Sequence, residues 1–324
     1  MKPQATIPPG WFKNGGDQGL AVSVSVMLEG WDEDGAPGIG PMGNPLRAGV
    51  YDTQGRSWSD YGPKAGAWRL LDILTVEKVR AVFYVSGIVA ERYPELMTAI
   101  VAAGHAVAAH SWSQHMIPAY LSPEDETADI GRCTAVIERT TGCRPAGWLS
   151  PRCTPSASTS TLIAAAGYRW HADTFDSDLP YAVQTESGAL LAVPFTMEIN
   201  DMPLYIRYGN EPQAFTRTLE RLLDQWHVLP KGTACMDITA HAHVFGRPAG
   251  AVEFAKSLQA VKRREQCAWL TSHHEIEQLW TLEGQGAEKK RGGQALRPKH
   301  SSPNTAGPDA ANDTALGFAC FQFD

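Results

Sequence analysis

The sequence has little of what nucleic-acid-binding and membrane-spanning proteins need. Its 324 residues include 28 Lys and Arg against 35 Asp and Glu, which gives a formal net charge of −7. A phosphate-binding surface needs an excess of basic side chains, so we expect no nucleic-acid partner. The most apolar early stretch, Leu20 to Leu28, spans nine residues. A membrane helix needs about 20 apolar residues, so we expect no membrane partner either.

Export signals, cysteine pairs and nucleotide loops are also missing. The first residues, MKPQATIPPGWFKNGG, place prolines and glycines where a signal peptide has its apolar segment, which predicts a cytoplasmic protein. The six cysteines contain no CxxC pair, so neither a zinc knuckle nor a disulfide framework is indicated. The patterns GxxxxGK[ST] and GxSxG do not occur, which disfavours a phosphate loop and serine catalysis.

Short β-branched runs alternate with amphipathic stretches of helical period between Leu20 and Trp280, which predicts βα units around a parallel sheet. About seven such units favour a closed or nearly closed β/α barrel, with an open doubly wound sheet as the alternative. We expect strands at 20–28, 80–87, 105–111, 146–150, 168–173, 190–199, 234–241 and 267–271. We expect helices at 66–74, 88–104, 122–142, 158–167, 211–226 and 249–264.

Composition divides the chain into three parts. Residues 20–282 form the predicted barrel domain, preceded by an N-terminal arm at 1–19. Residues 283–324 are rich in Gly, Pro, Ser, Asn and charge, which predicts a disordered tail. The connection from Glu29 to Lys64 is long for a compact domain, and such connections are usually functional.

Polar residues fall repeatedly at the C-terminal ends of the predicted strands, where barrel active sites are built. They are Glu29, His110, Ser150, Arg152, Asp173, Asp176, Asp178, Asn200, Asp201, His241 and His243. We therefore expect these side chains to meet at one mouth. The predicted substrate-binding residues there are Asp176, Asp178, Asn200, Asp201 and His243.

The segment AHSWSQH suggests a metal site, because His110 and His115 bracket a short turn after a strand. Neutral imidazoles bind zinc and similar divalent ions, and Glu29 is the natural carboxylate of a three-ligand site. Helical ligands would be spaced i, i+4, but that position holds Gln114, so a bound ion requires a loop here. The alternative is two hydrogen-bonded histidines at a rim.

Two further segments supply candidate catalytic and binding groups. In ITAHAHVFG, one of His241 and His243 can face the mouth as a proton donor while the other packs beneath, because alternate strand residues point to opposite sides. Arg152 could be a cation fixed by Asp176 and Asp178, or simply a salt-bridge partner.

Tryptophans cluster by the same loops, at Trp31, Trp58, Trp112, Trp148 and Trp170. They suit either a wall for a sugar or planar ring or an ordinary core. Trp112 is the tryptophan that we assign to substrate binding.

Taken in order, VSVSVMLEG, AGHAVAAHSWSQH, RPAGWLSPR, DSDLPY and HAHVFGRPAG resemble the polysaccharide deacetylase superfamily, or NodB-homology fold. The resemblance covers about residues 20–280 and is strongest to the branch with PuuE-type allantoinases, cyclic imide hydrolases and peptidoglycan-deacetylase-like proteins. It implies a distorted (β/α)7 barrel and hydrolysis of a non-peptide C–N bond.

The resemblance also implies roles for single residues. Glu29 and His110 match the metal-binding acid and first metal histidine, His241 matches the general acid, and Arg152 with Asp176 and Asp178 matches supporting motifs. Two departures are the single acid Glu29, where sugar deacetylases have two aspartates, and Gln114 at the second histidine position, which leaves only His115 to replace it.

The leading prediction is an amidohydrolase in which a divalent metal, zinc first, activates water at Glu29, His110 and His115, and His241 protonates the leaving nitrogen. The substrate is a small amide, a cyclic imide or an N-acetylated sugar. One alternative is an allantoinase-like or cyclic imide hydrolase without a tightly bound metal, and another is a non-catalytic carbohydrate-binding or metabolite-binding barrel. A homo-oligomer would agree with the resemblance.

Overall fold

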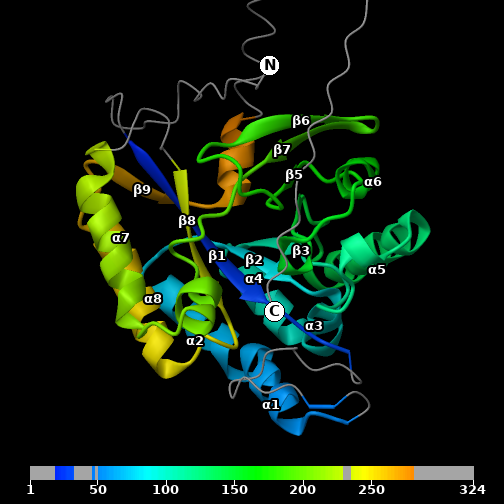
Figure 1. Ribbon diagram of the computed structural model, residues 1–324, viewed down its shortest axis with the longest axis horizontal. Helices are drawn as coiled ribbons and strands as arrows, with labels where there is room; N and C mark the ends of the chain where they lie inside the picture. The colour runs from blue at the N-terminus through cyan, green and yellow to red at the C-terminus, as the bar shows by residue number, and fades with distance from the viewer. Residues whose placement is uncertain (1–18, 33–45, 48–49, 229–234, 281–324) are drawn as a thin grey trace, which may run out of the picture. The chain divides into compact units, whose positions relative to one another are not determined.

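A nine-stranded sheet, the helices α1 to α8 and a further helical segment at 273–280 make up most of the computed structural model, which describes residues 19–32, 46–47, 50–228 and 235–280 (Figure 1). The strands are β1 Leu20–Leu28, β2 Val82–Val85, β3 Ala106–Ala109, β4 Gly147–Trp148, β5 Trp170–His171, β6 Tyr181–Thr185, β7 Gly188–Ala192, β8 Cys235–His241 and β9 Ala268–Thr271. The helices are α1 Thr53–Tyr61, α2 Ala67–Val76, α3 Gly87–Arg92, α4 Pro94–Ala102, α5 Pro123–Thr141, α6 Thr159–Ala165, α7 Gln213–Gln225 and α8 Pro248–Lys262. The predicted tail at 283–324 and nearly all of the predicted arm lie outside the described residues.

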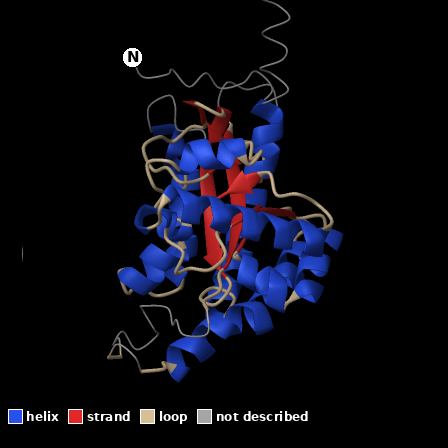
Figure 2. Cartoon of the chain, turned by 90° about the vertical axis from the view of Figure 1, so that its right-hand side faces the viewer, coloured by secondary structure: helices blue, strands red, loops and turns tan. Residues whose placement is uncertain are grey.

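The strands follow one another around the sheet in nearly their chain order, β6-β7-β5-β4-β3-β2-β1-β8, and β9 pairs with the start of β1. All pairs are parallel except the β6–β7 hairpin. The segment after β7 bridges back to β8 at Asn200 and Thr239, so the sheet curls toward closure and the alternative of an open doubly wound sheet was wrong. The predicted α/β class is confirmed, with a sheet that curls into a partial barrel and helices around it (Figure 2).

The two faces of β1 show how the sequence divides the core. Alternate residues Val22, Val24 and Val26 pack with helix side chains in the outer core cluster. The intervening Ser23 and Ser25 point to the other side, toward polar residues of β8. The inside of the curled sheet is therefore partly polar.

Local signals in the sequence mark α5 well. The Ser122 hydroxyl accepts a hydrogen bond from the Asp125 amide, Pro123 occupies the first turn, and Gly142 ends the helix with a φ of 72°. The predicted helix at 88–104 is instead two helices, α3 and α4, because a residue before proline avoids the helical conformation and Tyr93 precedes Pro94.

Two elements were not predicted. Helix α1 lies within the long connection after β1 and continues into a π-helical turn, η1 Gly62–Gly66. Strand β6, which pairs with β7 as a hairpin at the edge of the sheet, is the other, whereas β7 overlaps the strand predicted at 190–199. Both segments are short or polar, so hydrophobic periodicity does not distinguish them from loops.

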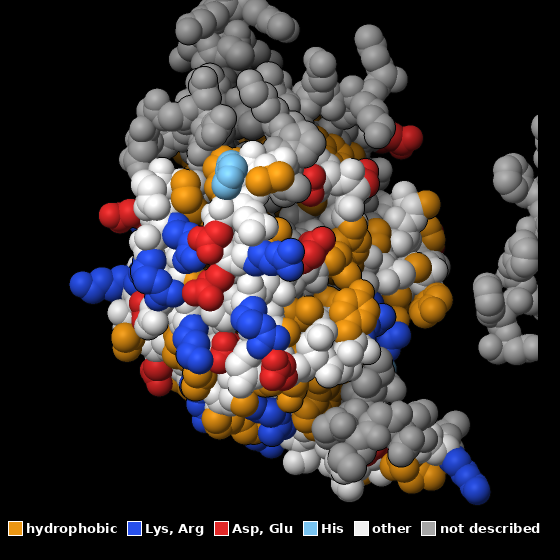
Figure 3. All heavy atoms as spheres, turned by 60° about the vertical axis from the view of Figure 1, so that its left-hand side comes forward, with side chains coloured by type: hydrophobic (Ala, Val, Ile, Leu, Met, Phe, Trp, Pro, Cys, Tyr) orange, Lys and Arg blue, Asp and Glu red, His pale blue; other side chains and the backbone are white. Residues whose placement is uncertain are grey.

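Helices α7 and α8 present a solvated surface of mixed charge (Figure 3). Arg263 pairs with Glu220 at 3.1 Å, and Arg264 pairs with Asp224 at 2.6 Å, both across the two helices. Exposed pairs of this kind contribute little to stability. Among the described helices, none combines the length and apolarity that crossing a bilayer requires.

Glycine at position 66 lets η1 approach the turn after β8. A Cβ atom on Gly66 would lie 1.8 Å from the carbonyl oxygen of Ala242. We expect Gly66→Ala to lower the free energy of unfolding by about 1–3 kcal/mol, as overpacking does. Urea denaturation would measure it.

The matched control is Gly131→Ala on the exposed side of α5, where a Cβ would meet nothing within 4 Å. Alanine favours helix over glycine by roughly 0.5–1 kcal/mol, so this variant should gain stability. Equal stability of the Gly66 and Gly131 variants would contradict the packing argument.

Candidate active site

The register of the parallel strands places Glu29 and His110 at the same edge of the sheet. Leu28 of β1 pairs with Val85 of β2, and Val85 pairs with Ala109 of β3. Glu29 and His110 each follow these paired residues directly, so the parallel strands deliver them to the same edge of the sheet. His241 ends β8 and pairs with Met27.

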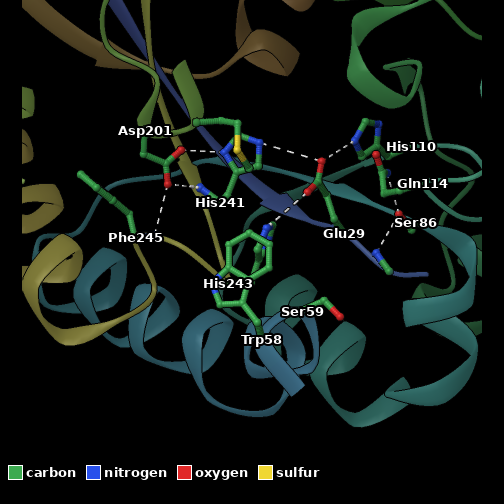
Figure 4. A network of polar contacts seen from close by, with 12 residues as sticks. Glu29, Trp58, Ser59, Ser86, His110, Gln114, Asp201, His241, His243 and Phe245 are labelled. Carbon is green, nitrogen blue, oxygen red and sulfur yellow. Dashed lines mark hydrogen bonds and ion pairs between the residues drawn. The ribbon is translucent and has the colours of Figure 1, made fainter. Parts of the chain in front are cut away.

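Glu29 lies at the centre of three imidazoles, two of which face its Oε1 atom (Figure 4). His110 Nε2 lies 3.5 Å and His241 Nε2 lies 3.9 Å from this oxygen. His243 Nε2 lies 3.8 Å from Oε2. The structure thus brings together four residues predicted to share one site.

The charge of Glu29 is set by opposing effects. Burial by itself raises the pKa of the carboxyl group, but the facing histidines, with His241 first, outweigh burial and lower the pKa to about 2. Glu29 is therefore a carboxylate at neutral pH.

Asp201 fixes the orientation of His241. The His241 ring donates from Nδ1 to Asp201 Oδ1 at 2.6 Å, while the backbone amides of His241 and Phe245 donate to Oδ2 at 2.8 and 3.2 Å. This leaves Nε2 of His241 directed toward Glu29. Burial lowers the pKa of His241, but Asp201 and then Glu29 outweigh burial, so the pKa is raised overall.

His243 also faces Glu29, contrary to the expectation that alternate strand residues diverge. β8 ends at His241, and the turn that follows directs both rings to the same side. The rings of Trp58 and Trp31 pack edge-to-face against His243, with centroids 4.5 and 5.6 Å away. Neither ring nitrogen of the buried His243 has a hydrogen-bond partner, and burial lowers its pKa to about 4.

A second buried carboxylate supports the side of the site that contains His110. The Leu149 carbonyl accepts a 2.7 Å hydrogen bond from His110 Nδ1, so Nε2 faces Glu29. The next residue, Ser150, donates its amide and its hydroxyl to Asp173, both at 2.7 Å. Burial raises the pKa of Asp173 to about 6.

The predicted three-ligand metal site is not assembled in the described residues. His115 lies half-exposed beside Asp32, 3.7 Å from its carboxylate, rather than beside Glu29. Gln114, which stands at the i+4 position, is buried and contacts Ser86.

In the part of the chain that is described, no group of three His, Cys, Asp or Glu side chains could hold an ion. These residues do not fit the metal site that the sequence suggested.

Other predicted residues take different places. Trp112 is a core residue with the Arg132 guanidinium 3.3 Å from its ring centroid, and it is not brought to Glu29. Arg152 is exposed, and within the described ranges no ion pair joins it to Asp176 or Asp178, so the structure does not bring these three residues together.

The remaining predicted substrate-binding groups also differ in position. Asp176 accepts a hydrogen bond from Tyr181 at 2.8 Å, and Asp178 is exposed. Asn200 accepts one from the Met202 amide at 3.0 Å. Asp201 is fully buried and orients His241, so the structure gives it a positioning role rather than contact with substrate.

Comparisons with known proteins agree with this geometry. The Polysaccharide deacetylase family profile matches residues 59–171. A Schizosaccharomyces pombe protein assigned as a polysaccharide deacetylase is 26% identical over 246 residues, which is 68% of this chain and 74% of the relative. This chain contains a polysaccharide deacetylase domain. The deacetylase domain is a hydrolase of carbon–nitrogen bonds, and such deacetylases are generally metal-dependent.

Solved structures extend the similarity to most of the deacetylase domain. A probable polysaccharide deacetylase from Pseudomonas aeruginosa is 25% identical with a TM-score of 0.74, covering 86% of this chain and 95% of that one. A PuuE allantoinase has the same TM-score at 24% identity and covers 86% and 94%. At that identity the allantoinase supports the fold alone. The predicted NodB-type fold is confirmed.

One residue of the deacetylase site, Ser86, was missed from the sequence, and Trp58 was predicted only as part of a possible ring-binding wall or core. Ser86 follows β2 and receives hydrogen bonds from Gly30 and Gln114. Trp58 comes from the unpredicted α1 and packs on His243. Ser86 stands at a strand end like the others, so the same rule could have found it, whereas no local pattern marks Trp58.

Burial of His171 should make the stability of the deacetylase domain fall in mild acid. Burial lowers its pKa from the ordinary 6.5 to about 4, so between these values the unfolded chain binds a proton that the folded chain does not. This contribution to stability is lost as the pH falls from about 6.5 to about 4. Urea denaturation across this range should show a smaller loss for His171→Leu than for the wild type. Parallel pH curves would contradict this assignment.

Proposed function

We propose that the deacetylase domain hydrolyses the C–N bond of an acylated amine, with His241 as the general acid and Glu29 as the group that holds the attacking water. This proposal rests on two contacts, one between Asp201 and His241 and one between His241 and Glu29. They join a fixed imidazole to a buried carboxylate at the mouth of a deacetylase-type barrel. A proton donor and a water-binding anion at this separation are what amide hydrolysis requires.

His241 supplies the proton that the leaving nitrogen needs. Amines leave poorly as anions, so the nitrogen must be protonated as the C–N bond breaks. Asp201 binds Nδ1–H and thereby places the second ring proton on Nε2, which faces the centre. Asp201 and Glu29 raise the pKa of His241, which favours the protonated ring.

Glu29 has two roles in this scheme. Its charge helps to keep His241 protonated, and its oxygens accept hydrogen bonds from the water that attacks the carbonyl carbon. The water oxygen forms the new C–O bond while its proton passes to Glu29. His241 then gives its own proton to the nitrogen, and the acid and the amine are released.

The two proton transfers support each other. His241 is the first of the charges that lower the pKa of Glu29. As His241 loses its proton, Glu29 becomes a stronger base. Glu29 Oε1 and His241 Nε2 lie 3.9 Å apart, so the proton on Glu29 can return to His241 and restore the starting state.

The predicted metal enters no step of this scheme, because among the described residues no group of three His, Cys, Asp or Glu side chains could hold an ion. The substrate that we propose is a small acylated amine or N-acetylated sugar, in keeping with the deacetylase relative and with the predicted cytoplasmic location. The five tryptophans near the loops are buried, so none offers an open face for a sugar ring.

A substrate panel tests the proposal. The purified chain would be assayed for amine release from N-acetylated sugars, simple N-acyl amines and cyclic imides, and its bound metal would be measured. We expect hydrolysis by the wild type and loss of it in Glu29→Gln, which keeps the shape of the side chain. Turnover of no acyl amide, or full activity of Glu29→Gln, would overturn the proposal.

A further inference from the structure

Gln114 is buried beside the catalytic centre and has no part in the scheme above. It lies in the turn after β3, four residues beyond His110, with its side chain 4% exposed. Figure 4 shows Gln114 next to His110, on the side of Glu29 opposite to His241. A buried amide must have its polar atoms satisfied, so its contacts indicate its role.

Hydrogen bonds hold Gln114 to the residue that follows Glu29. Its backbone amide donates to the Gly30 carbonyl at 2.9 Å. Its side-chain Nε2 donates to Ser86 Oγ at 3.0 Å, and the Gly30 amide donates to the same Oγ at 3.2 Å. One end of the side-chain amide is therefore fixed.

The other end, Oε1, is available. No described residue donates a hydrogen bond to it, yet it is not among the enclosed polar atoms that lack a partner. Oε1 therefore borders open space rather than packed protein. A fixed acceptor of this kind favours a ligand that brings a donor.

We propose that Gln114 Oε1 accepts a hydrogen bond from an N–H or O–H group on the acyl side of the substrate. This inference rests on the proposed function. His241 must reach the leaving nitrogen, so the substrate extends from His241 across Glu29, and its acyl group lies toward His110 and Gln114 (Figure 4). Gln114 is then a specificity-determining residue that favours donor-bearing acyl groups over plain acetyl groups.

The physical basis is the cost of an unpaired acceptor. An acyl group with a donor satisfies Oε1, whereas one without a donor displaces water from it and leaves it unpaired. Sites that bind a substrate OH or NH in this way discriminate strongly against analogues that lack it. Here we expect a preference on the order of 10²-fold in kcat/KM.

Three amides of one amine test the inference. N-glycolyl has a terminal hydroxyl, N-methoxyacetyl has the same oxygen without a donor, and N-acetyl has neither. The wild type should prefer N-glycolyl over both others. Gln114→Leu should abolish this preference through loss of N-glycolyl turnover alone, and Gln114→Glu, which keeps an acceptor oxygen, should retain it.

Controls separate the outcomes. Gln278→Leu makes the same chemical change on an exposed helix and should leave the preference unchanged. Circular dichroism melting would confirm that each variant is folded. If no amide is hydrolysed, the proposed function fails. If all three are hydrolysed with equal kcat/KM, or if Gln114→Leu keeps the preference, the role of Gln114 is overturned while the proposed function stands.

Discussion

Asp201→Asn is expected to reduce amide hydrolysis by on the order of 10³-fold, close to the effect of His241→Ala, because Asp201 controls the proton that His241 transfers. Asp201 is fully buried and binds Nδ1–H at 2.6 Å. Asparagine has nearly the same size but lacks the charge. Its neutral amide no longer stabilises the doubly protonated ring, so His241 is less often in the form that gives a proton from Nε2.

The pH profile distinguishes this role from simple packing. Asp201 is the first of the groups that raise the pKa of His241. The acid form of His241 is the active one, so activity falls as the pH rises through its pKa. In Asp201→Asn that pKa is lower, and the remaining activity should fall at lower pH than in the wild type. An unshifted profile, or near-normal kcat, would show that Asp201 does not act through His241.

Asp32→Asn is the matched control. Asp32 lies near the same mouth and accepts a hydrogen bond from Ser113 at 2.8 Å, but its carboxylate is half-exposed and faces His115. The substitution should change kcat/KM far less than Asp201→Asn does.

Much of the site could be predicted from strand ends. Parallel strands deliver the residues after them to one edge, and Glu29, His110 and His241 each stand at such a position. This rule needs only the hydrophobic pattern of each strand, which β-branched runs such as β1 make plain. The α/β class followed from the same alternation of patterns.

Side-chain direction could not be predicted in the same way. His115 seemed to replace a ligand because of its spacing, but the turn from Trp112 to His115 directs Gln114 inward and His115 outward. His243 seemed to diverge from His241, yet β8 ends early and the turn brings both rings to Glu29. The conformation of the two loops sets the directions of these side chains, and the hydrophobic periodicity of the sequence does not predict loop conformation.

The sequence also could not predict which residue each of these side chains contacts. Asp201 stood out as an acid at a strand end, but its neighbour could have been substrate, an arginine or a histidine. The contact with His241 joins residues 40 positions apart in the sequence. The same limit applies to Trp58, whose helix lies in a connection without strong amphipathic pattern.

Beneath the site, Asp237 should be the largest single contributor to stability among the buried carboxylates. Its side chain is fully buried inside the curled sheet. The hydroxyls of Ser23, Ser25 and Thr239 donate to it at 2.5, 2.9 and 2.5 Å, and His273 Nε2 lies 3.2 Å away. One carboxylate thus accepts hydrogen bonds from hydroxyl groups on both β1 and β8.

We expect Asp237→Ala to lower the free energy of unfolding by about 3–5 kcal/mol, because it leaves three hydroxyl groups without their acceptor in a buried interior. Urea denaturation measures the loss. Asp224→Ala is the control, since Asp224 is exposed and its pair with Arg264 should contribute little to stability. Similar losses in the two variants would contradict a stabilising role for the buried network.

The same substitution should also affect catalysis, and the reason is geometric. Ser25 and Thr239 pair directly across β1 and β8, and these two strands end in Glu29 and His241. Removing the shared acceptor loosens the strands that set the 3.9 Å separation of the two catalytic groups. Below its melting temperature, folded Asp237→Ala should therefore show reduced kcat with an unchanged pH profile, since the charges around His241 remain.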